Sequence, residues 1–362
     1  MSSVADFRQF RPRRWLSNGH LQTIAGNFLP RMSSLPAATS QLVEVVPARG
    51  SQMATQILCE CHWQPMEQRA ARPTVLLLHG LEGSSRSQYV IGNANKLWRA
   101  GCNIIRMNMR NCGGTERLTP TLYHSGLSTD VERVMRFFLQ QYHLQSFSLM
   151  GYSMGGNLVL KLTGELGSNA PAELRSVIGV SPAVDLAASA DLLHEWQNRL
   201  YERRFLHALL KRFRRKSMLF PRVFDPNRAN GIHSLREFDD RITALYSGFR
   251  SADDYYERAA AARVIDHIAV PTLLLHAVDD PFVRITEPTR AKIAANPNIT
   301  FLEPAHGGHC AFLADPDPAQ NDDGYWAERT ALKFLYERAW AEQPGFPSRS
   351  LTLGRDAGRV DR

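Results

Sequence analysis

A serine inside a glycine-rich turn is the feature of this sequence that most directly predicts chemistry. Ser153 is the central residue of Gly151-Tyr152-Ser153-Met154-Gly155, a G-x-S-x-G pattern. An apolar run at 146–150 precedes the pattern, and a helix-like run at 157–162 follows it. A strand-to-helix turn with small flanking residues exposes a serine hydroxyl, and the helix N-terminus favours negative charge there. We therefore expect Ser153 to be the nucleophile of an acyl-transfer reaction.

A serine nucleophile needs a base, and the base needs a carboxylate that orients it. When the chain order is serine, acid, histidine, the acid follows a late strand. Asp280 is the preferred acid because Pro281 starts a new turn beside it, which leaves Asp279 as a local turn acceptor. Asp185, which follows an earlier strand, is a weaker alternative.

The histidine is expected in a loop beyond the acid. His309 and His306 both lie in such a loop, separated by Gly307-Gly308. We favour His309, because the two glycines allow the loop to bring its ring close to Ser153. Either histidine alone would be taken for a surface residue, but here serine, acid and histidine follow in the expected order.

A loop after an apolar strand offers the groups that would stabilise an oxyanion. The run His79-Gly80-Leu81-Glu82-Gly83 carries few bulky side chains, so a backbone N–H can point at a reacting oxygen. We expect the N–H of Leu81 to be one donor and that of Met154 the other. Phosphate binding is the alternative use of such a loop, but the Lys-Ser/Thr of a P-loop and the G-x-G-x-x-G pattern are both absent.

The surrounding pattern predicts an α/β fold with a mostly parallel central sheet that helices cover on both faces. Alternation at 41–46 and 55–63 indicates two half-buried antiparallel strands. From residue 73 onward, continuous apolar runs alternate with amphipathic segments, which is typical of parallel strands and crossover helices. We expect further strands at 74–79, 103–107, 146–150, 177–180, 272–276 and 299–302, and helices at 88–100, from a cap near Ser128, at 287–295 and at 323–341.

These elements divide the chain into five predicted segments. An N-terminal arm that ends in a short helix near Asn18–Ile24 comes first, and an arginine-rich helical insertion interrupts the α/β core. A tail rich in Pro, Gly, Ser and Arg comes last. The predicted boundaries are 1–40 for the arm, 41–182 for the first part of the core, 183–264 for the cap insertion, 265–342 for the second part of the core and 343–362 for the tail.

Two other groups of residues suggest ligands but have simpler explanations. Cys59, Cys61 and His62 resemble part of a metal site, yet no second Cys/His pair follows at zinc-site spacing, and strand alternation explains them. His20 is more typical of a packing or surface histidine than of a ligand. We expect no metal and no cofactor.

Composition narrows the class of protein. The 362 residues carry a net charge of +8, which permits contact with nucleic acid, a membrane or an acidic substrate. Binding motifs and stacking aromatics for nucleic acid are absent, so we expect no nucleic-acid partner. Five cysteines without framework spacing favour reduced thiols and a cytoplasmic location, and no stretch is apolar enough to span a membrane.

One part of the insertion is a basic amphipathic helix at 199–216. Leu206, Leu209, Leu210 and Phe213 form an apolar stripe beside a cationic face. The commoner arrangement is a lid helix that packs on the sheet and leaves its basic face in solvent. The alternative is weak peripheral binding of the helix to anionic lipid.

Together these motifs resemble the YheT-like branch of the α/β-hydrolases, also called the AB hydrolase-4 family. The resemblance covers roughly residues 15–337 and does not include the arginine-rich insertion or the tail. It implies a Ser153, Asp280, His309 charge relay that hydrolyses carboxylic esters, with short- to medium-chain acyl esters or lipids as substrates. The motifs that carry it are Asn18-Gly19-His20-Leu21-Gln22-Thr23, His79-Gly80-Leu81-Glu82-Gly83, Arg110-Asn111-Cys112-Gly113-Gly114, Tyr123-His124-Ser125-Gly126, Gly151-Tyr152-Ser153-Met154-Gly155-Gly156-Asn157, Asp279-Asp280-Pro281-Phe282 and Gly307-Gly308-His309.

We therefore expect a cofactor-free serine esterase that acts on a small-molecule acyl ester. Two alternatives remain open at this point. An alcohol rather than water could resolve the acyl-enzyme, which would make the protein an acyltransferase on the same triad. The chain could also be a non-catalytic binding scaffold with an α/β-hydrolase fold.

Overall fold

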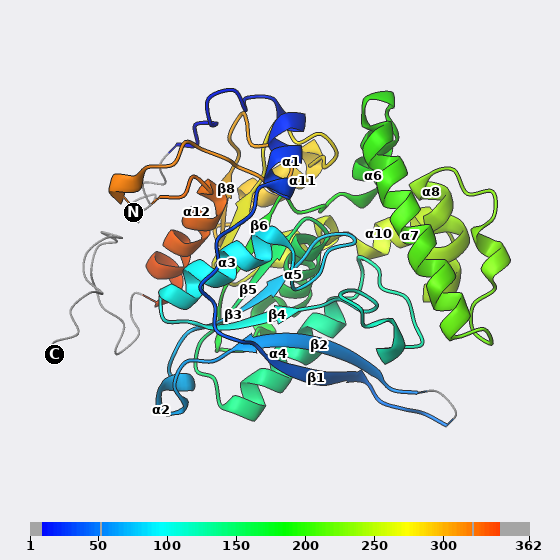
Figure 1. Ribbon diagram of the computed structural model, residues 1–362, viewed down its shortest axis with the longest axis horizontal. Coiled ribbons are helices and arrows are strands. Elements are labelled where there is room, and N and C mark those ends of the chain that lie inside the picture. The colour runs from blue at the N-terminus through cyan, green and yellow to red at the C-terminus, as the bar shows by residue number, and fades with distance from the viewer. Residues whose placement is uncertain (1–8, 51–52, 321, 341–362) are drawn as a thin grey trace.

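The computed structural model describes residues 9–50, 53–320 and 322–340 and is built around an eight-stranded sheet (Figure 1). The strand order is β1-β2-β4-β3-β5-β6-β7-β8. β1 and β2 pair antiparallel, β2 is antiparallel to β4, and all later neighbours are parallel. The bounds are β1 Thr39–Val46, β2 Thr55–His62, β3 Thr74–Leu78, β4 Asn103–Met107, β5 Phe147–Tyr152, β6 Leu174–Val180, β7 Thr272–Leu275 and β8 Ile299–Leu302.

The central strands are apolar along their whole length because helices cover both faces of the sheet. In β3 all five residues are buried, with Val75 and Leu77 in one hydrophobic cluster and Leu76 and Leu78 in the other. Successive side chains of a strand point to opposite faces, so a continuous apolar run needs two cores. The fold class expected from the sequence is therefore confirmed.

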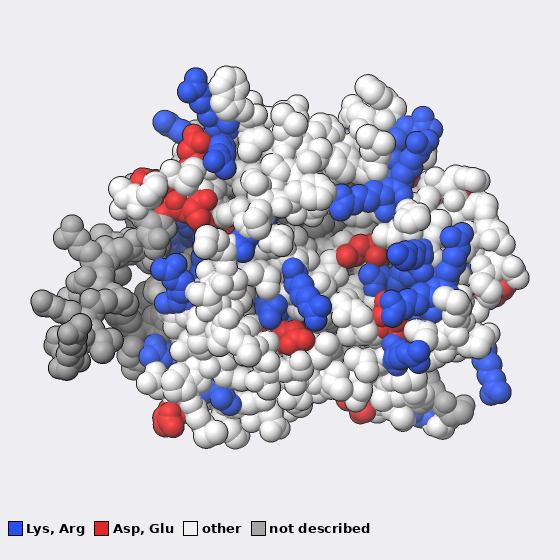
Figure 2. Space-filling model, viewed as in Figure 1, with Lys and Arg blue, Asp and Glu red and all other residues white. Residues whose placement is uncertain are grey.

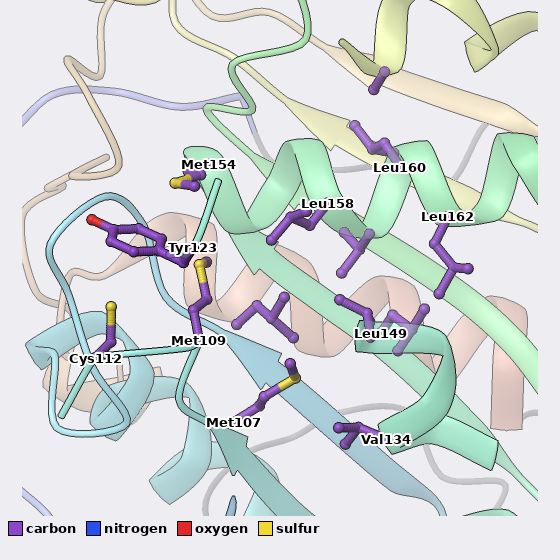
Figure 3. Close-up of a cluster of buried hydrophobic side chains, with 14 of the residues drawn as sticks. Met107, Met109, Cys112, Tyr123, Val134, Leu149, Met154, Leu158, Leu160 and Leu162 are labelled. Carbon is purple, nitrogen blue, oxygen red and sulfur yellow. The ribbon is translucent and has the colours of Figure 1, made fainter. Parts of the chain in front are cut away.

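One face is covered by α3 (Gln88–Arg99) and α12 (Trp326–Leu335), and the other by α4 (Ser128–Tyr142) and α5 (Met154–Leu166). α11 (Glu287–Ala295) packs against β8. Figure 3 shows the second core, where Leu158 and Leu162 of α5 face Leu149 of β5. Met154 and Tyr123 extend this cluster toward the carboxyl ends of the strands.

α4 begins at Ser128, as predicted, but two details of the predicted helices are wrong. Ser128 does not cap α4: Leu127 precedes the helix, and the Ser128 hydroxyl donates to Glu165 of α5 instead. The last helix begins at Trp326 rather than 323, because the preceding chain turns at Gly324 and forms a bridge between Leu313 and Tyr325. α12 continues into a π-helical turn, Tyr336–Trp340.

The chain between β6 and β7 is helical and lies at one side of the sheet, on the right in Figure 1. We call this segment the cap. It contains α6 Leu186–His194, α7 Arg199–Leu219, α8 Leu235–Phe238, a π-helical turn Asp239–Ala244, α9 Leu245–Ser247 and α10 Ala252–Ala259.

Two short helices lie outside this plan, α1 (Gly19–Phe28) and α2 (Met66–Arg69). Asn18 caps α1, its side chain accepting from the N–H groups of His20 and Leu21. Within the described ranges, no helix is both long and apolar enough to cross a bilayer. The predicted tail, 343–362, lies outside the described residues.

Candidate active site

Ser153 lies in a tight turn between β5 and α5. Its φ of 53° is in the left-handed region, which is unusual for a residue with a Cβ and marks backbone strain of the kind found at functional sites. The turn leaves no room for side chains around it: a Cβ at Gly151 would collide with the carbonyl of Gly155, and a Cβ at Gly155 with the carbonyl of His79. The glycines of the motif are therefore required by close backbone packing.

His309 and Asp280 are in direct contact. His309 Nδ1 lies 2.8 Å from Asp280 Oδ2; the Asp280 side chain is fully buried, and that of His309 is 10% exposed. The other oxygen, Oδ1, accepts the N–H groups of Phe282 at 3.1 Å and Val283 at 3.0 Å. Because an ionised carboxylate only accepts hydrogen bonds, Nδ1 carries the proton and Nε2 is left as the basic nitrogen.

Electrostatics keep Asp280 ionised and favour protonation of the His309 ring. Burial disfavours charge on both groups, but their mutual attraction outweighs it, lowering the pKa of Asp280 and raising the pKa of His309 above its ordinary value of 6.5. The ring of Phe282 packs against the imidazole with a centroid separation of 4.2 Å and limits its movement.

The alternative acids and histidine have other partners. Asp279 accepts the N–H of Gly308 at 2.8 Å and faces His306 at 3.5 Å, so it joins two loops and is not the local turn acceptor that we expected. Asp185 accepts from the N–H of Thr286 and the hydroxyl of Thr289, both at 2.9 Å, and so holds the start of α11.

The loop at 79–83 runs beside Ser153. Gly80 approaches so closely that a Cβ placed there would lie 3.1 Å from the Cβ of Ser153. Within the described part of the chain, the N–H groups of Leu81 and Met154 donate to no other residue. Met154 is the first residue of α5, where the helix leaves N–H groups free and favours negative charge.

Charged and aromatic groups fix the 79–83 loop. Glu82, with a φ of 56°, accepts from Arg212 Nε and Nη2 of α7, both at 2.9 Å, and from the hydroxyl of Tyr123. Burial lowers the pKa of His79 to about 4, so this ring is neutral. It donates from Nδ1 to the carbonyl of Gly80 and accepts the N–H of Met109 at Nε2.

α1 holds the loop that carries His309, a role that sequence analysis missed. The hydroxyl of Thr23 accepts the N–H of His309 at 2.8 Å. Gln22 exchanges two hydrogen bonds with the backbone of Leu313, at 2.8 and 3.0 Å. The motif Asn18–Thr23 was visible in the sequence, but nothing in its pattern indicated a partner so far along the chain.

Two cavities meet at Ser153. The larger, of about 470 Å³, is open and is also lined by Leu81, Phe282 and His309. The smaller, of about 150 Å³, extends under the cap and is mostly apolar. Its apolar lining includes Leu122, Met154, Leu193, Phe205, Leu209, Phe213, Phe238 and Val283, with Ser125, Asp239, Tyr255 and Tyr256 among its polar residues.

The described residues include no cluster of three or more His, Cys, Asp or Glu side chains arranged to hold a metal ion. Cys59 and Cys61 are buried in the core on alternate positions of β2, and the ring of His62 accepts from Arg106 at 3.2 Å. His20 stacks on Tyr201 of α7, with ring centroids 5.7 Å apart.

Comparison with known proteins assigns the family. The model of the alpha/beta hydrolase fold family matches residues 73–316, which is most of the chain. The protein is an α/β-hydrolase. A relative from Escherichia coli (strain K12), named "Putative esterase YheT", is 30% identical over 84% of this chain and 87% of its own.

Other relatives agree with an esterase-like or lipase-like hydrolase. "Phospholipase ABHD3" of Homo sapiens is 28% identical, over 86% of this chain and 75% of its own. The Pyrococcus furiosus esterase Pf2001 aligns with a TM-score of 0.51 at 13% identity, covering 86% of this chain and 99% of its own. At that identity the structural match supports the fold alone.

In this α/β-hydrolase the basic helix predicted at 199–216 is part of α7, which lies over the smaller cavity. Figure 2 shows that Lys and Arg side chains gather over α7. Leu206, Leu209 and Phe213 of the predicted apolar stripe are buried and face other cap residues or the cavity. The stripe is therefore covered by protein and is not available to lipid. Lys216, also buried, donates to Asn111 and to the carbonyls of Glu116 and Thr119.

Proposed function

We propose that this protein is a serine hydrolase that cleaves carboxylic esters through an acyl-enzyme. In this proposal Ser153 is the nucleophile, His309 the general base and acid, and Asp280 the residue that orients the imidazole. The observation that carries it is the 2.8 Å contact between His309 and Asp280, with His309 and Ser153 lining one cavity.

The reaction would proceed in two steps, acylation of Ser153 and hydrolysis of the acyl-enzyme. Ser153 Oγ attacks the ester carbonyl carbon while His309 Nε2 takes the hydroxyl proton, and the carbonyl electrons move onto the oxygen. The N–H groups of Leu81 and Met154 would stabilise that oxyanion. The tetrahedral intermediate then expels the alcohol, which receives the proton from His309, and water repeats the sequence to release the acid.

The smaller cavity suits the acyl group, and its size suggests short or medium chains. It has a volume of about 150 Å³ and a mainly apolar lining. An engineered cavity of about 150 Å³ with apolar walls binds benzene, so the space takes a group of roughly six carbons. Phe205 and Phe213 limit its extension, so longer chains would need the cap to move.

The decisive experiment measures hydrolysis of p-nitrophenyl esters of increasing acyl length by the wild-type protein and by Ser153→Ala. We expect the fastest cleavage with short or medium chains and a loss of about 10⁶-fold in kcat for the variant. A clear optimum at long acyl chains would contradict the proposed chain length.

Labelling with a fluorophosphonate probe separates a catalytic serine from a non-catalytic scaffold. The wild-type protein should be labelled, and Ser153→Ala should not. Unlabelled wild-type protein, together with identical behaviour of the two proteins toward every ester, would rule out the proposed function.

A further inference from the structure

The outward face of α1 is apolar and its inward face is polar, the reverse of a helix in a soluble protein. Leu21, Ile24 and Phe28 follow one another at helical spacing and are 50%, 47% and 66% exposed. The buried face carries Gln22 and Thr23, which hold the loop of His309. Amphipathic helices of soluble proteins place the apolar stripe inward, so something other than this chain is expected to cover these side chains.

The start of α7 continues this apolar surface. Leu200 is 79% exposed, and Trp196, just before the helix, is 81% exposed. α1 and α7 touch at this end of the molecule: the ring of His20 stacks on Tyr201, and Arg204 lies over the ring of Phe28 at 5.6 Å.

The same surface is positively charged. Arg203 and Arg204 are exposed, and neither forms an ion pair with a carboxylate of the described residues. Glu202, which precedes them on the chain, points inward, where its side chain is 7% exposed and accepts from the N–H of Leu235. Farther along the helix Arg212 pairs with Glu82, whereas Lys211 and Arg214 are exposed and form no ion pair among the described residues, so unpaired positive charge extends along α7 from its start.

The open cavity that contains Ser153 and His309 has its mouth in this surface. Ile24 and Phe28 from α1 and Arg204 from α7 all line it. Exposed apolar side chains and the unpaired Arg204 therefore form part of the wall of the cavity that contains Ser153 and His309.

We propose that an entrance rim, formed by Leu21, Ile24 and Phe28 of α1 and by Leu200, Arg203 and Arg204 of α7, docks on anionic lipid bilayers. The apolar side chains enter the headgroup region, and the arginines contact lipid phosphates. The cavity then opens directly onto the membrane, where acyl lipids are concentrated.

Charge favours a lipid surface over a second copy of the chain. A two-fold interface would bring the same patch of each subunit together, so Arg203 and Arg204 would face the identical arginines of the partner. Like charges in contact oppose such a dimer, whereas an anionic bilayer is complementary to them.

The test is co-sedimentation with phosphatidylcholine vesicles, with and without phosphatidylglycerol, using variants outside the cavity lining. Leu21→Ser/Leu200→Ser/Arg203→Gln removes two apolar groups and one charge. Since one basic side chain near an anionic surface contributes roughly a fivefold change in partitioning, we expect binding to fall at least about fiftyfold for the triple variant. Wild-type binding should require phosphatidylglycerol and weaken as salt is added.

A matched control carries the same kinds of change elsewhere. Met66→Ser/Arg214→Gln alters an exposed apolar residue of α2 and an exposed arginine farther along α7. It should bind vesicles nearly as well as the wild-type protein. Hydrolysis of a soluble short-chain ester and the thermal unfolding temperature should be unchanged in both variants, which shows that the triple variant is folded.

Three results would overturn the inference. They are no binding of wild-type protein to phosphatidylglycerol vesicles, equal binding by the triple variant and the wild type, and a wild-type dimer in analytical ultracentrifugation that the triple variant breaks. Vesicle binding is measured without catalysis, so a failure of the membrane-docking proposal can be distinguished from a failure of the proposed esterase activity.

Discussion

Two loops line the cavity that contains Ser153, and different interactions hold them. The 79–83 loop is fixed to the cap by a mostly buried ion pair between Glu82 and Arg212. The loop that carries His309 is fixed to α1 mainly by neutral hydrogen bonds, such as that from its backbone to Thr23. In the proposed mechanism the first loop stabilises the oxyanion and the second moves protons.

This difference predicts how the two loops respond to substitution. A neutral hydrogen bond contributes about 1 kcal/mol, whereas removing one partner of a buried ion pair costs about 3 kcal/mol or more. The cap should therefore control the 79–83 loop strongly, and α1 should tune the loop of His309 more gently. The contact between Asp280 and His309 is an exception among the interactions of the His309 loop, because it joins charged groups and takes part directly in the proposed reaction.

The largest effect in the loop of His309 is expected for Asp280→Asn. The amide no longer holds Nδ1–H in the required tautomer, and kcat should fall about 10⁴-fold. Asp279→Asn is the matched control, since its carboxylate binds Gly308 and not His309. Steady-state kinetics on a short-chain ester would measure both; an equal loss in the two variants would contradict the assignment of Asp280.

A smaller but still large effect is expected for Arg212→Met in the cap. Glu82 would be left buried without its partner, so the free energy of unfolding should fall by about 3 kcal/mol. With the 79–83 loop released, kcat should fall about 10²-fold while KM changes little, because the lost contact acts on the transition state.

Two variants sharpen the test of Arg212. Arg212→Lys keeps the charge but loses the bidentate contact, and should recover stability more than kcat. Arg215→Gln removes an arginine of the same helix that is 61% exposed and pairs only peripherally with Glu116, so it should leave kcat unchanged. A rise in KM together with a fall in kcat for Arg212→Met would point to a disturbed cavity instead of a displaced loop.

The pH dependence of kcat/KM should show the charged contact in the loop of His309. The base must be neutral to act, and Asp280 raises its pKa in spite of burial. Activity should therefore fall as the pH drops through a value above 6.5, by about tenfold for each pH unit below it. In Asp280→Asn this acidic limb should move to lower pH; a limb at the same pH in both proteins would assign it to another group.

The smallest effect is expected at the neutral contact with α1. Thr23→Val removes the acceptor of the His309 N–H, and the loss of about 1 kcal/mol should lower kcat/KM about fivefold. Thr23→Ser keeps the hydroxyl and should restore the activity. If Thr23→Val lowered the activity as much as Arg212→Met does, the proposed difference between the two loops would be contradicted.

The sequence predicted those parts of the molecule that depend on local pattern. The apolar run of β3 implied a strand covered on both faces, and the glycines around Ser153 implied a turn too tight for side chains. The preference for Asp280 over Asp279 rested on the neighbouring proline, and in the structure Asp280 is the residue that contacts His309.

The contacts that hold the two loops could not be predicted in the same way. Glu82 and Arg212 are 130 positions apart, and Thr23 and His309 are 286 apart. Each is a single polar residue in a segment with another dominant pattern, so no periodicity reveals its partner. The sequence also did not reveal which side of α1 is buried. A helix usually buries its apolar side, but α1 buries its polar side.

The distance along the chain between α1 and its partner loop has a consequence for biogenesis. Closing so long a loop costs chain entropy before its contacts can stabilise the fold. During synthesis Thr23 of α1 is made 286 residues before His309, so α1 exists long before the segment that it supports. The nucleophile turn can thus be complete while the proton-transfer groups are still unassembled, so an unfinished chain carries no competent hydrolase.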